Sequence, residues 1–255
     1  MPSRFAVFDH PTPLAIAHRG GAAEAEENTE AAFTHAARLG YRFIETDVQA
    51  TRDGVAVILH DDSLQRTCGT PERVADLDWP ELARRRTLGG NPIPRLDATL
   101  AAFPGMRFIL EAKSDASPGP MAEAIRRTNA LDRVCVGAFS ARRTAALRRD
   151  LGPRLAWSPA HAGVARVWLA GWGLPLRAPD CAALQVPLRF RGVPVVTARM
   201  LRRAHAEGLQ VHVWTVDEPS TMARLLDLGV DGLMTDRPTV LRELLISRGQ
   251  WTGAA

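Results

Sequence analysis

The stretch FIETDVQATRDGVAVILH, residues 43–60, contains two extended runs on either side of a tight-turn signal. Apolar and β-branched residues fill both runs, and the tetrapeptide TRDG between them is of the kind that joins the strands of a hairpin. The second run, residues 55–60, therefore predicts the returning strand of a β-hairpin. A turn centred in TRDG places His60 roughly opposite Glu45 to Asp47, so the hairpin brings a histidine close to two carboxylates.

Outside this hairpin, short β-rich runs alternate with helical stretches, which is typical of a parallel α/β fold. The eight runs predicted as barrel strands are Leu14–His18, Phe43–Val48, Arg107–Lys113, Val134–Phe139, Leu155–Ser158, Ala183–Pro187, Gln210–Val216 and Val230–Thr235. The clearest helical stretches are Thr29–Leu39, Pro120–Ala130, Ala141–Leu151, Ala198–Glu207 and Ser220–Leu228. Asn28 is the predicted N-cap of the first helix, and a glycine follows four of these helices. We predict one α/β domain over residues 1–255, a (β/α)8 TIM barrel.

Residues 61–94 interrupt this alternation before the helical stretch Arg95–Phe103. The segment is rich in Arg, Gly, Pro and Asp, and it is too long for a simple loop. We predict a small insertion that packs over the C-terminal face of the barrel, where the active sites of this fold lie, and that shapes the entry of a substrate.

The composition indicates a cytoplasmic protein without a membrane-spanning segment. The longest apolar stretches are broken within about ten residues, whereas a bilayer requires roughly 20. Residues 1–17 lack a basic segment followed by a continuous apolar run, so no signal peptide is predicted. Cys68, Cys135 and Cys181 are widely separated and odd in number, which is typical of reduced structural thiols.

The net charge of +4 and the pI of about 9.6 raise the question of nucleic acid binding. The basic residues are spread along the chain, and no basic helix interleaved with aromatic residues is present. We therefore expect solvated basic faces, no nucleic acid partner and no stable membrane insertion. The sequence leaves the oligomeric state open.

Lys113 is the only lysine among 32 basic residues, and it follows the apolar run of a predicted strand. A compact ammonium differs from a guanidinium in the acceptors that it reaches, so a lysine retained in an arginine-rich chain suggests a specific role. The alternative is that this lysine persists by chance and has no specific role.

Three carboxylates occupy strand positions that point together. Glu45 and Asp47 alternate on one strand and so face the same side, and Glu111 lies near the end of the next barrel strand, two residues before Lys113. Carboxylates directed together repel one another unless a cation lies between them. Their hard oxygen atoms predict Mg²⁺ or Ca²⁺ rather than zinc or copper. Helix capping or pairing with arginine is the alternative.

His18 and His60 each end a predicted β-run and flank these carboxylates. A single histidine at such a position is more often a partly buried side chain with its hydrogen bonds satisfied than a catalytic residue. The pair instead suggests general acid–base catalysis, because the imidazole pKa lies nearest neutrality.

Several motifs resemble those of the glycerophosphodiester phosphodiesterase family, within the phospholipase-C-like phosphodiesterase superfamily. They are HRG (18–20), ENT (27–29), ETDV (45–48), TRDG (51–54) leading to HD (60–61), ILEAK (109–113), VWTV (213–216) and VDGLMTDRP (230–238). The matches run in order from about residue 15 to 240. One departure is Glu26, which stands where many members have proline, and we expect it to alter loop stiffness more than chemistry. Residues 157–195 match no block and are where substrate identity is expected to be decided.

The resemblance implies a TIM-barrel hydrolase that cleaves small glycerophosphodiesters to sn-glycerol 3-phosphate and an alcohol. It implies these roles: His18 and His60 as general acid and base, Glu45, Asp47 and Glu111 as ligands of Mg²⁺ or Ca²⁺, Arg19 and Lys113 near the phosphate, and Glu27 and Trp214 lining the pocket. Core packing is an alternative role for Trp214.

Two other functions remain open. A lysophospholipase D is suggested by the apolar segment Val164–Leu176, if Trp168 and Trp172 form an apolar rim. We favour an amphipathic barrel helix with both tryptophans buried. A catalytically silent barrel that binds phosphorylated ligands is the alternative from a different class, and the complete set of polar residues argues against it.

Overall fold

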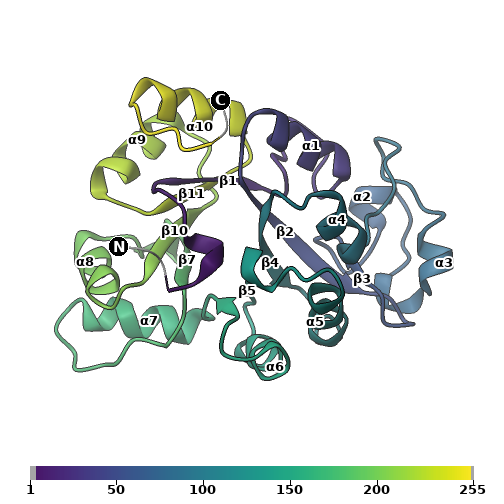
Figure 1. Ribbon diagram of the computed structural model, residues 1–255, viewed down its shortest axis with the longest axis horizontal. Helices are drawn as coiled ribbons and strands as arrows, with labels where there is room; N and C mark the ends of the chain where they lie inside the picture. Colours follow the sequence, from purple (N-terminus) through teal and green to yellow (C-terminus); the bar gives the residue numbers. More distant parts are fainter. Residues whose placement is uncertain (1–3, 254–255) are drawn as a thin grey trace.

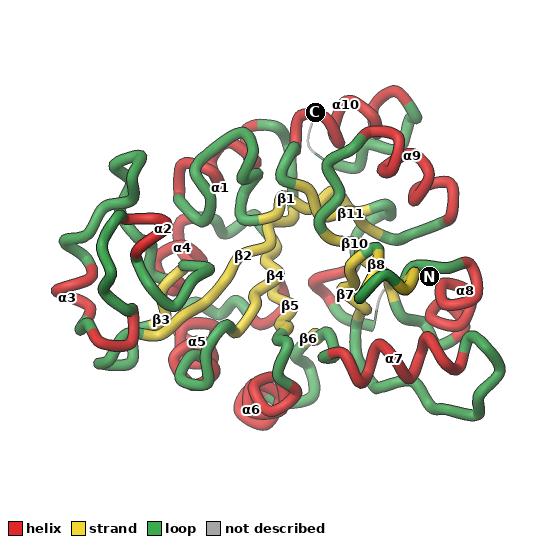
Figure 2. Tube along the Cα trace, turned by 180° about the vertical axis from the view of Figure 1, so that it is seen from behind, coloured by secondary structure: helices red, strands yellow, loops and turns green. Residues whose placement is uncertain are grey.

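Eight parallel strands form a nearly closed barrel in the computed structural model, which describes residues 4–253 (Figures 1 and 2). They are β1 (Leu14–His18), β2 (Phe43–Ala50), β4 (Arg107–Ala112), β5 (Val134–Gly137), β6 (Ala156–Trp157), β7 (Ala183–Pro187), β10 (Gln210–Trp214) and β11 (Gly232–Thr235). All eight predicted strands are present, with ends that differ by at most two residues. The sheet order β6-β5-β4-β2-β1-β11-β10-β7 confirms the predicted (β/α)8 barrel.

The barrel is continuous from β6 round to β7, and backbone pairing of β1 with β11 joins the first strand to the last. Between β6 and β7 the ladder gives way to one backbone hydrogen bond, from the Ala182 N–H to the Trp157 carbonyl at 2.9 Å. The carboxyl ends of all eight strands therefore meet at one end of the barrel, which forms its mouth.

Helices surround the barrel on its outside (Figure 1). They are α1 (Glu30–Arg38), α4 (Leu96–Ala102), α5 (Pro118–Arg127), α6 (Ala141–Leu151), α7 (His161–Ala170), α8 (Ala198–Ala206), α9 (Pro219–Leu228) and α10 (Pro238–Ser247), with a 3-10 turn η3 (Leu131–Arg133) before β5. The predicted cap of α1 was wrong: the hydroxyl of Thr29, not Asn28, accepts the Ala32 N–H at 3.1 Å. Asn28 has a φ of 59°, a region that asparagine tolerates, and this turns its side chain towards β2 instead.

The end of the barrel opposite the mouth is closed by the N-terminal segment. The 3-10 turn η1 (Ala6–Phe8) buries Val7 and Phe8 against a cluster that includes Ile16 and Phe43. His212 lies fully buried in the same region, with its ring edge-on to Phe8 at 4.9 Å between centroids. Access to the barrel interior is therefore from the mouth.

The predicted β-hairpin is confirmed. Strand β3 (Ala56–Ile58) pairs antiparallel with β2, with Ile58 opposite Val48. The Leu59 N–H continues the ladder to the Asp47 carbonyl at 3.1 Å. This register carries His60 to the level of the β2 carboxylates, as the turn signal predicted.

Residues 61–94 contain α2 (Gln65–Cys68), the 3-10 turn η2 (Val74–Asp76) and α3 (Trp79–Leu82). The prediction that this insertion covers the mouth was wrong. Leu64, Val74 and Leu82 cluster with Val57 of β3 and with Leu59, on the outer side of the hairpin, so the insertion lies beside the barrel (Figures 1 and 2). None of residues 61–94, all of which the structure describes, lines the pocket at the mouth.

A short hairpin, β8 (Arg189–Phe190) and β9 (Val193–Pro194), follows β7 and projects at the mouth end, in front of β7 and β10 in Figure 2. No helix within residues 4–253 has the length and apolar character needed to cross a membrane.

Candidate active site

A pocket of about 580 Å³ opens at the mouth of the barrel, which is within the usual range for small-molecule sites. Eight of the nine side chains predicted for the site line it: His18, Arg19, Glu45, Asp47, His60, Glu111, Lys113 and Trp214. The ninth, Glu27, does not. Strands distant in sequence thus bring the predicted polar residues together, because all of them end at this mouth.

The three predicted carboxylates form one cluster. Glu45, Asp47 and Glu111 each offer a carboxylate oxygen, and these atoms lie within 4.8 Å of one another. Parallel pairing of β2 with β4 places Asp47 directly beside Glu111. Burial and the neighbouring Asp47 raise the pKa of Glu45 to about 8. Burial also raises the pKa of Glu111. The chain's own cations therefore leave this cluster short of positive charge, and three hard oxygen donors fit a divalent ion such as Mg²⁺ or Ca²⁺.

Two cationic side chains border the cluster. The Lys113 Nζ lies 3.1 Å from Glu111 Oε1 and 3.4 Å from Asp47 Oδ1. Arg19 Nε lies 3.2 Å from Asp47 Oδ2, and this Nε has no hydrogen-bond partner although it is buried. Both cations point into the pocket, where they are placed to meet an anionic group.

His18 is held between two carboxylates. Its Nδ1 lies 2.7 Å from Asp236 Oδ1, and its Nε2 lies 3.7 Å from Glu45 Oε2. Burial lowers the pKa of His18, but Glu45 and Asp236 outweigh that effect and raise the pKa above its ordinary value. The Asp236 contact leaves Nε2 as the ring nitrogen that faces the carboxylate cluster.

His60 has a carboxylate partner of its own. Its Nδ1 lies 2.6 Å from Asp61 Oδ1, and Arg66 Nε donates to the other oxygen of Asp61 at 2.6 Å. The Arg66 guanidinium and the His60 ring lower the pKa of Asp61 to about 2. Each of the two histidines is thus oriented through Nδ1 by a carboxylate, which for His18 is the distant Asp236 and for His60 is the next residue, Asp61.

Glu27 lies outside the pocket, which corrects its predicted place in the lining. Its carboxylate accepts hydrogen bonds from Arg66 at 2.7 Å and from Arg19 at 3.2 Å. It therefore joins the insertion to the pocket arginine. The neighbouring Glu26, where the family motif often has proline, accepts hydrogen bonds from Thr87, Gly89 and Asn91. It ties the insertion to the loop before α1, so its replacement of proline stabilises this loop through contacts.

Asn28 and Asp236 contact the site, although the sequence suggested no role for either in it. Asn28 is buried, donates to Asp47 Oδ2 at 2.9 Å and accepts from the Thr46 hydroxyl at 2.7 Å. A signal for Asp236 was present: it follows the last strand, and closure of a barrel brings that strand beside β1, which ends in His18.

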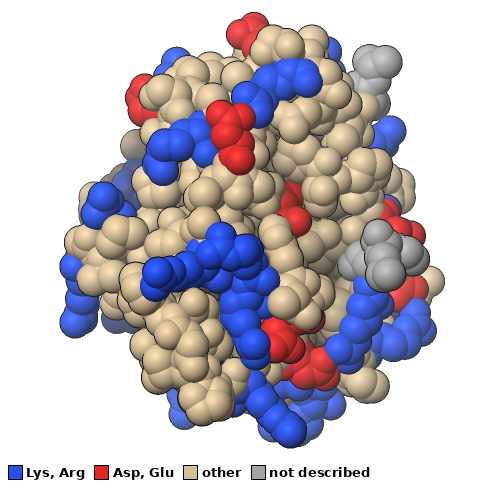
Figure 3. Space-filling view, turned by 90° about the vertical axis from the view of Figure 1, so that its left-hand side faces the viewer, with Lys and Arg blue, Asp and Glu red and all other residues tan. Residues whose placement is uncertain are grey.

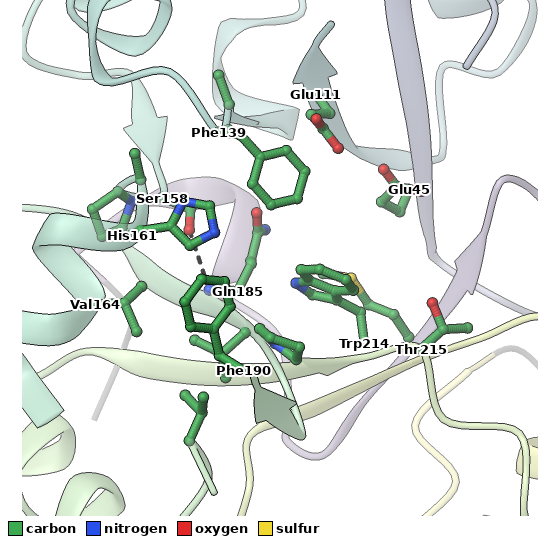
Figure 4. Close-up of a pocket in the computed structure, with 18 of the residues that line it drawn as sticks. Glu45, Glu111, Phe139, Ser158, His161, Val164, Gln185, Phe190, Trp214 and Thr215 are labelled. Atoms are coloured by element: carbon green, nitrogen blue, oxygen red, sulfur yellow. Dashed lines mark hydrogen bonds between the residues drawn. The ribbon is translucent and has the colours of Figure 1, made fainter. Parts of the chain in front are cut away.

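The opposite wall of the pocket is apolar and aromatic (Figure 4). We call this the apolar wall; its members are Phe139, His161, Val164, Trp168, Pro187, Phe190, Val193, Pro194 and Trp214. Phe139 meets His161 with ring centroids 5.3 Å apart and Trp214 at 5.9 Å. Figure 4 shows these rings turned towards one space, with Glu45 and Glu111 on its far side. Most of this wall comes from residues 157–195, the part of the chain in which the sequence showed no motif.

The preferred interpretation of the segment Val164–Leu176 was wrong in part. α7 is a barrel helix, but its tryptophans are not both buried: Trp168 is half-buried and lines the pocket, and Trp172 is 52% exposed. The helix ends at Ala170, so Trp172 lies beyond its apolar face.

Comparison with known proteins places this geometry in a family context. The sequence profile of the "Glycerophosphoryl diester phosphodiesterase family" matches residues 18–240. A "Probable glycerophosphodiester phosphodiesterase 2" of Mycobacterium tuberculosis is 44% identical, covering 96% of this chain and 95% of that protein. A human protein named lysophospholipase D is 28% identical, covering 90% of this chain and 85% of that protein. A phosphodiesterase of Oleispira antarctica, solved with the product sn-glycerol-3-phosphate, superposes with a TM-score of 0.77 at 23% identity, over 92% of this chain and 97% of its own.

Proposed function

The chain belongs to the glycerophosphoryl diester phosphodiesterase family, and we propose that His18 and His60 are the acid–base pair with which it hydrolyses glycerophosphodiesters to sn-glycerol 3-phosphate and an alcohol. It is an enzyme of the phosphoric diester hydrolase class. The observation that carries the catalytic assignment is the placement of both histidines beside one carboxylate cluster in one pocket, each with a carboxylate on Nδ1.

In this proposal the two histidines divide the proton transfers. One imidazole accepts the proton of the attacking oxygen, which belongs to water or to the glycerol 2-hydroxyl, and the other donates a proton to the departing alkoxide. If the 2-hydroxyl attacks, water then opens the cyclic phosphate to glycerol 3-phosphate. Asp236 and Asp61 hold the Nδ1 atoms, so both Nε2 atoms remain free for the reacting groups. The carboxylate partners also stabilise the protonated imidazolium of whichever histidine accepts the proton.

Arg19 and Lys113 bind the phosphoryl oxygens. Their charged atoms lie at the border of the carboxylate cluster and line the pocket. Negative charge that grows on the non-bridging oxygens in the transition state is stabilised by these fixed cations. Trp214 provides an apolar face on the other side of the reacting group.

Glu45, Asp47 and Glu111 would hold a divalent metal ion, Mg²⁺ or Ca²⁺. Such an ion supplies Lewis-acid stabilisation of the phosphoryl oxygens. Asn28 orients Asp47 for this role through the hydrogen bond to Oδ2.

The product of the Oleispira antarctica enzyme supports glycerol 3-phosphate as the common product. A water-soluble substrate of this class, such as glycerophosphocholine, engages the polar side of the pocket through its phosphate. Such a substrate has no acyl chain, so it does not need the whole apolar wall for binding.

A second candidate function is lysophospholipase D activity on substrates that keep an acyl chain. The apolar wall favours it, because aliphatic and aromatic side chains continue from the reacting groups to the rim formed by β8 and β9. The human relative named lysophospholipase D supports it as well. A non-catalytic barrel is not proposed. The cytoplasmic location and the single domain over residues 1–255 stay predictions from the sequence.

The test is product release from glycerophosphocholine by purified protein, before and after EDTA treatment and after readdition of Mg²⁺ or Ca²⁺. We expect glycerol 3-phosphate only with metal, and no detectable product from His18→Ala or His60→Ala. His205→Ala is the control, because His205 also pairs with a carboxylate but lies outside the pocket. Full activity of either pocket variant would exclude the proposed acid–base pair.

A further inference from the structure

Exposed apolar side chains gather at one side of the pocket mouth. Within residues 4–253 seven large apolar side chains are exposed: Leu88, Phe139, Trp172, Leu174, Phe190, Val193 and Ile246. Five of the seven belong to the pocket rim, to the hairpin β8–β9 or to the segment that follows α7. Clustered exposure of this kind marks an interaction surface, whereas single exposed apolar residues are ordinary.

Side-chain contacts join these residues into one surface. Trp168 Nε1 donates to the Pro194 carbonyl at 3.1 Å, which fixes α7 to the hairpin. The Trp168 and Trp172 rings meet with centroids 5.6 Å apart. The Arg199 guanidinium of α8 stacks over Trp172 at 4.2 Å. The surface therefore extends without interruption from the pocket lining to the outside of the molecule. We call residues 172–174, 189–194 and Arg199 the rim surface.

The charge of the chain is concentrated in the same segment. Residues 159–206 contain seven arginines and one acidic residue, Asp180, a net charge of +6 against +4 for the whole chain. Asp180 itself pairs with Arg4. Figure 3 views the side that carries α8 and shows a run of basic side chains across its middle, bordered by uncharged surface and, lower down, by acidic side chains.

We propose that the rim surface docks on a bilayer that contains anionic phospholipids. Tryptophan, phenylalanine and leucine side chains partition into the boundary between headgroups and acyl chains, and arginines beside them bind anionic headgroups. A nucleic acid would meet the same charge, but the exposed aliphatic side chains Leu174 and Val193 have no partner on a phosphate backbone. Docking of this kind is peripheral, because no helix within the described part of the chain can span a bilayer.

This placement has a consequence for the pocket. Phe190 and Val193 belong to both the apolar wall and the rim surface, and Trp168 of the apolar wall borders the rim surface through its hydrogen bond to Pro194. A docked protein would hold the pocket mouth against the lipid, so that an apolar chain passes from the bilayer along the apolar wall without crossing water. Docking can be measured without turnover. Its test therefore does not depend on the proposed hydrolysis.

The test is sedimentation of the purified full-length chain with vesicles of pure phosphatidylcholine or of phosphatidylcholine with phosphatidylglycerol. We expect binding to the anionic vesicles, and weak or no binding to the neutral ones. Trp172→Asp and Leu174→Asp, both outside the pocket lining, are each expected to weaken binding by roughly tenfold or more. Arg199→Glu is expected to weaken it by a similar factor, and the loss should be smaller at high salt.

Matched controls separate docking from general surface effects. Ile246→Asp removes an exposed apolar side chain on α10, and Arg224→Glu reverses an exposed charge on α9. Both should bind vesicles as the unmodified chain does, and thermal melting checks that every variant is folded. The proposal is overturned if the unmodified chain does not sediment with anionic vesicles, if the controls lose as much binding as the rim variants, or if double-stranded DNA displaces the vesicles.

Discussion

Asp236 Oδ1 lies 2.7 Å from His18 Nδ1, a contact that joins the end of the last barrel strand to the end of the first. The two residues are 218 positions apart in the chain. Asp236 is itself fixed, because Asp217 Oδ1 accepts its backbone N–H at 2.8 Å. The orientation of His18 therefore depends on closure of the barrel.

The first prediction concerns Asp236. Asp236→Asn keeps the shape but removes the charge that stabilises a protonated His18 and selects its tautomer. We expect kcat for glycerophosphocholine to fall roughly a hundredfold with little change in KM, by analogy with other carboxylate–histidine pairs. The acid limb of the pH–kcat profile should also move. Asp231→Asn is the control, since Asp231 pairs with His205 away from the pocket; an equal loss there would mean that the effect is structural.

The second prediction concerns the carboxylate cluster in protein stripped of metal. Burial and the neighbouring Asp47 raise the pKa of Glu45 to about 8, so when no metal is bound the folded chain must hold this carboxyl protonated near neutral pH, which opposes folding. Glu45→Gln replaces the titrating carboxyl with a neutral group of the same shape, so folding no longer has to protonate it, and we expect the metal-free variant to melt about 3 °C higher than the metal-free unmodified chain. Added Mg²⁺ or Ca²⁺ should raise the melting temperature of the unmodified chain but not that of the variant. An equal response to metal in both proteins would remove Glu45 from the ligand set.

Local signals were sufficient to predict the barrel and its polar wall. The hairpin at residues 43–60 has a strong turn signal and alternating carboxylates, so its register and the position of His60 followed from short-range geometry alone. Strand ends were placed within two residues for the same reason. Motifs confined to one strand end are thus readable without tertiary information.

Features that depend on packing between distant segments were predicted less well. The insertion at residues 61–94 packs on the outside of β3 because its apolar side chains find partners there, which no local pattern reveals. Trp172 is exposed because α7 ends two residues earlier, at Ala170. Glu27 carries a family motif but turns to Arg66, whose place is set by the fold of the insertion. The apolar wall is likewise assembled from loops whose sequences carry no shared motif.

The third prediction is a pH dependence of stability from His212. Burial at the closed end of the barrel lowers its pKa to about 3, whereas the unfolded chain has an ordinary imidazole pKa near 6.5. Between these values the unfolded state binds one more proton, so stability falls as the pH is lowered, by about 1.4 kcal/mol per pH unit from this residue. Above pH 7 the effect is absent.

His212→Gln should lower the slope of the free energy of unfolding against pH by the equivalent of about one bound proton. This holds whatever the substitution does to stability at neutral pH. The measurement is urea unfolding at several pH values between 4 and 8. Thr144→Val, at a buried position that carries no ionisable group, is the control and should leave the slope unchanged. An unaltered slope in the His212 variant would show that the folded protein admits a protonated ring at this site.

The fourth prediction separates the two substrate classes. Val164 lines the pocket from α7, remote from the carboxylate cluster, and belongs to the apolar wall. Val164→Asn places an amide where an acyl chain would lie, which costs apolar contact and leaves a polar group poorly solvated. We expect kcat/KM for lysophosphatidylcholine to fall roughly tenfold, and that for glycerophosphocholine to change less than twofold. Val240→Asn, on α10 and also half-buried, should leave kcat/KM unchanged for both substrates. If both substrates lose activity equally, the apolar wall supports the fold of the site, and the lysophospholipase D alternative loses its structural basis.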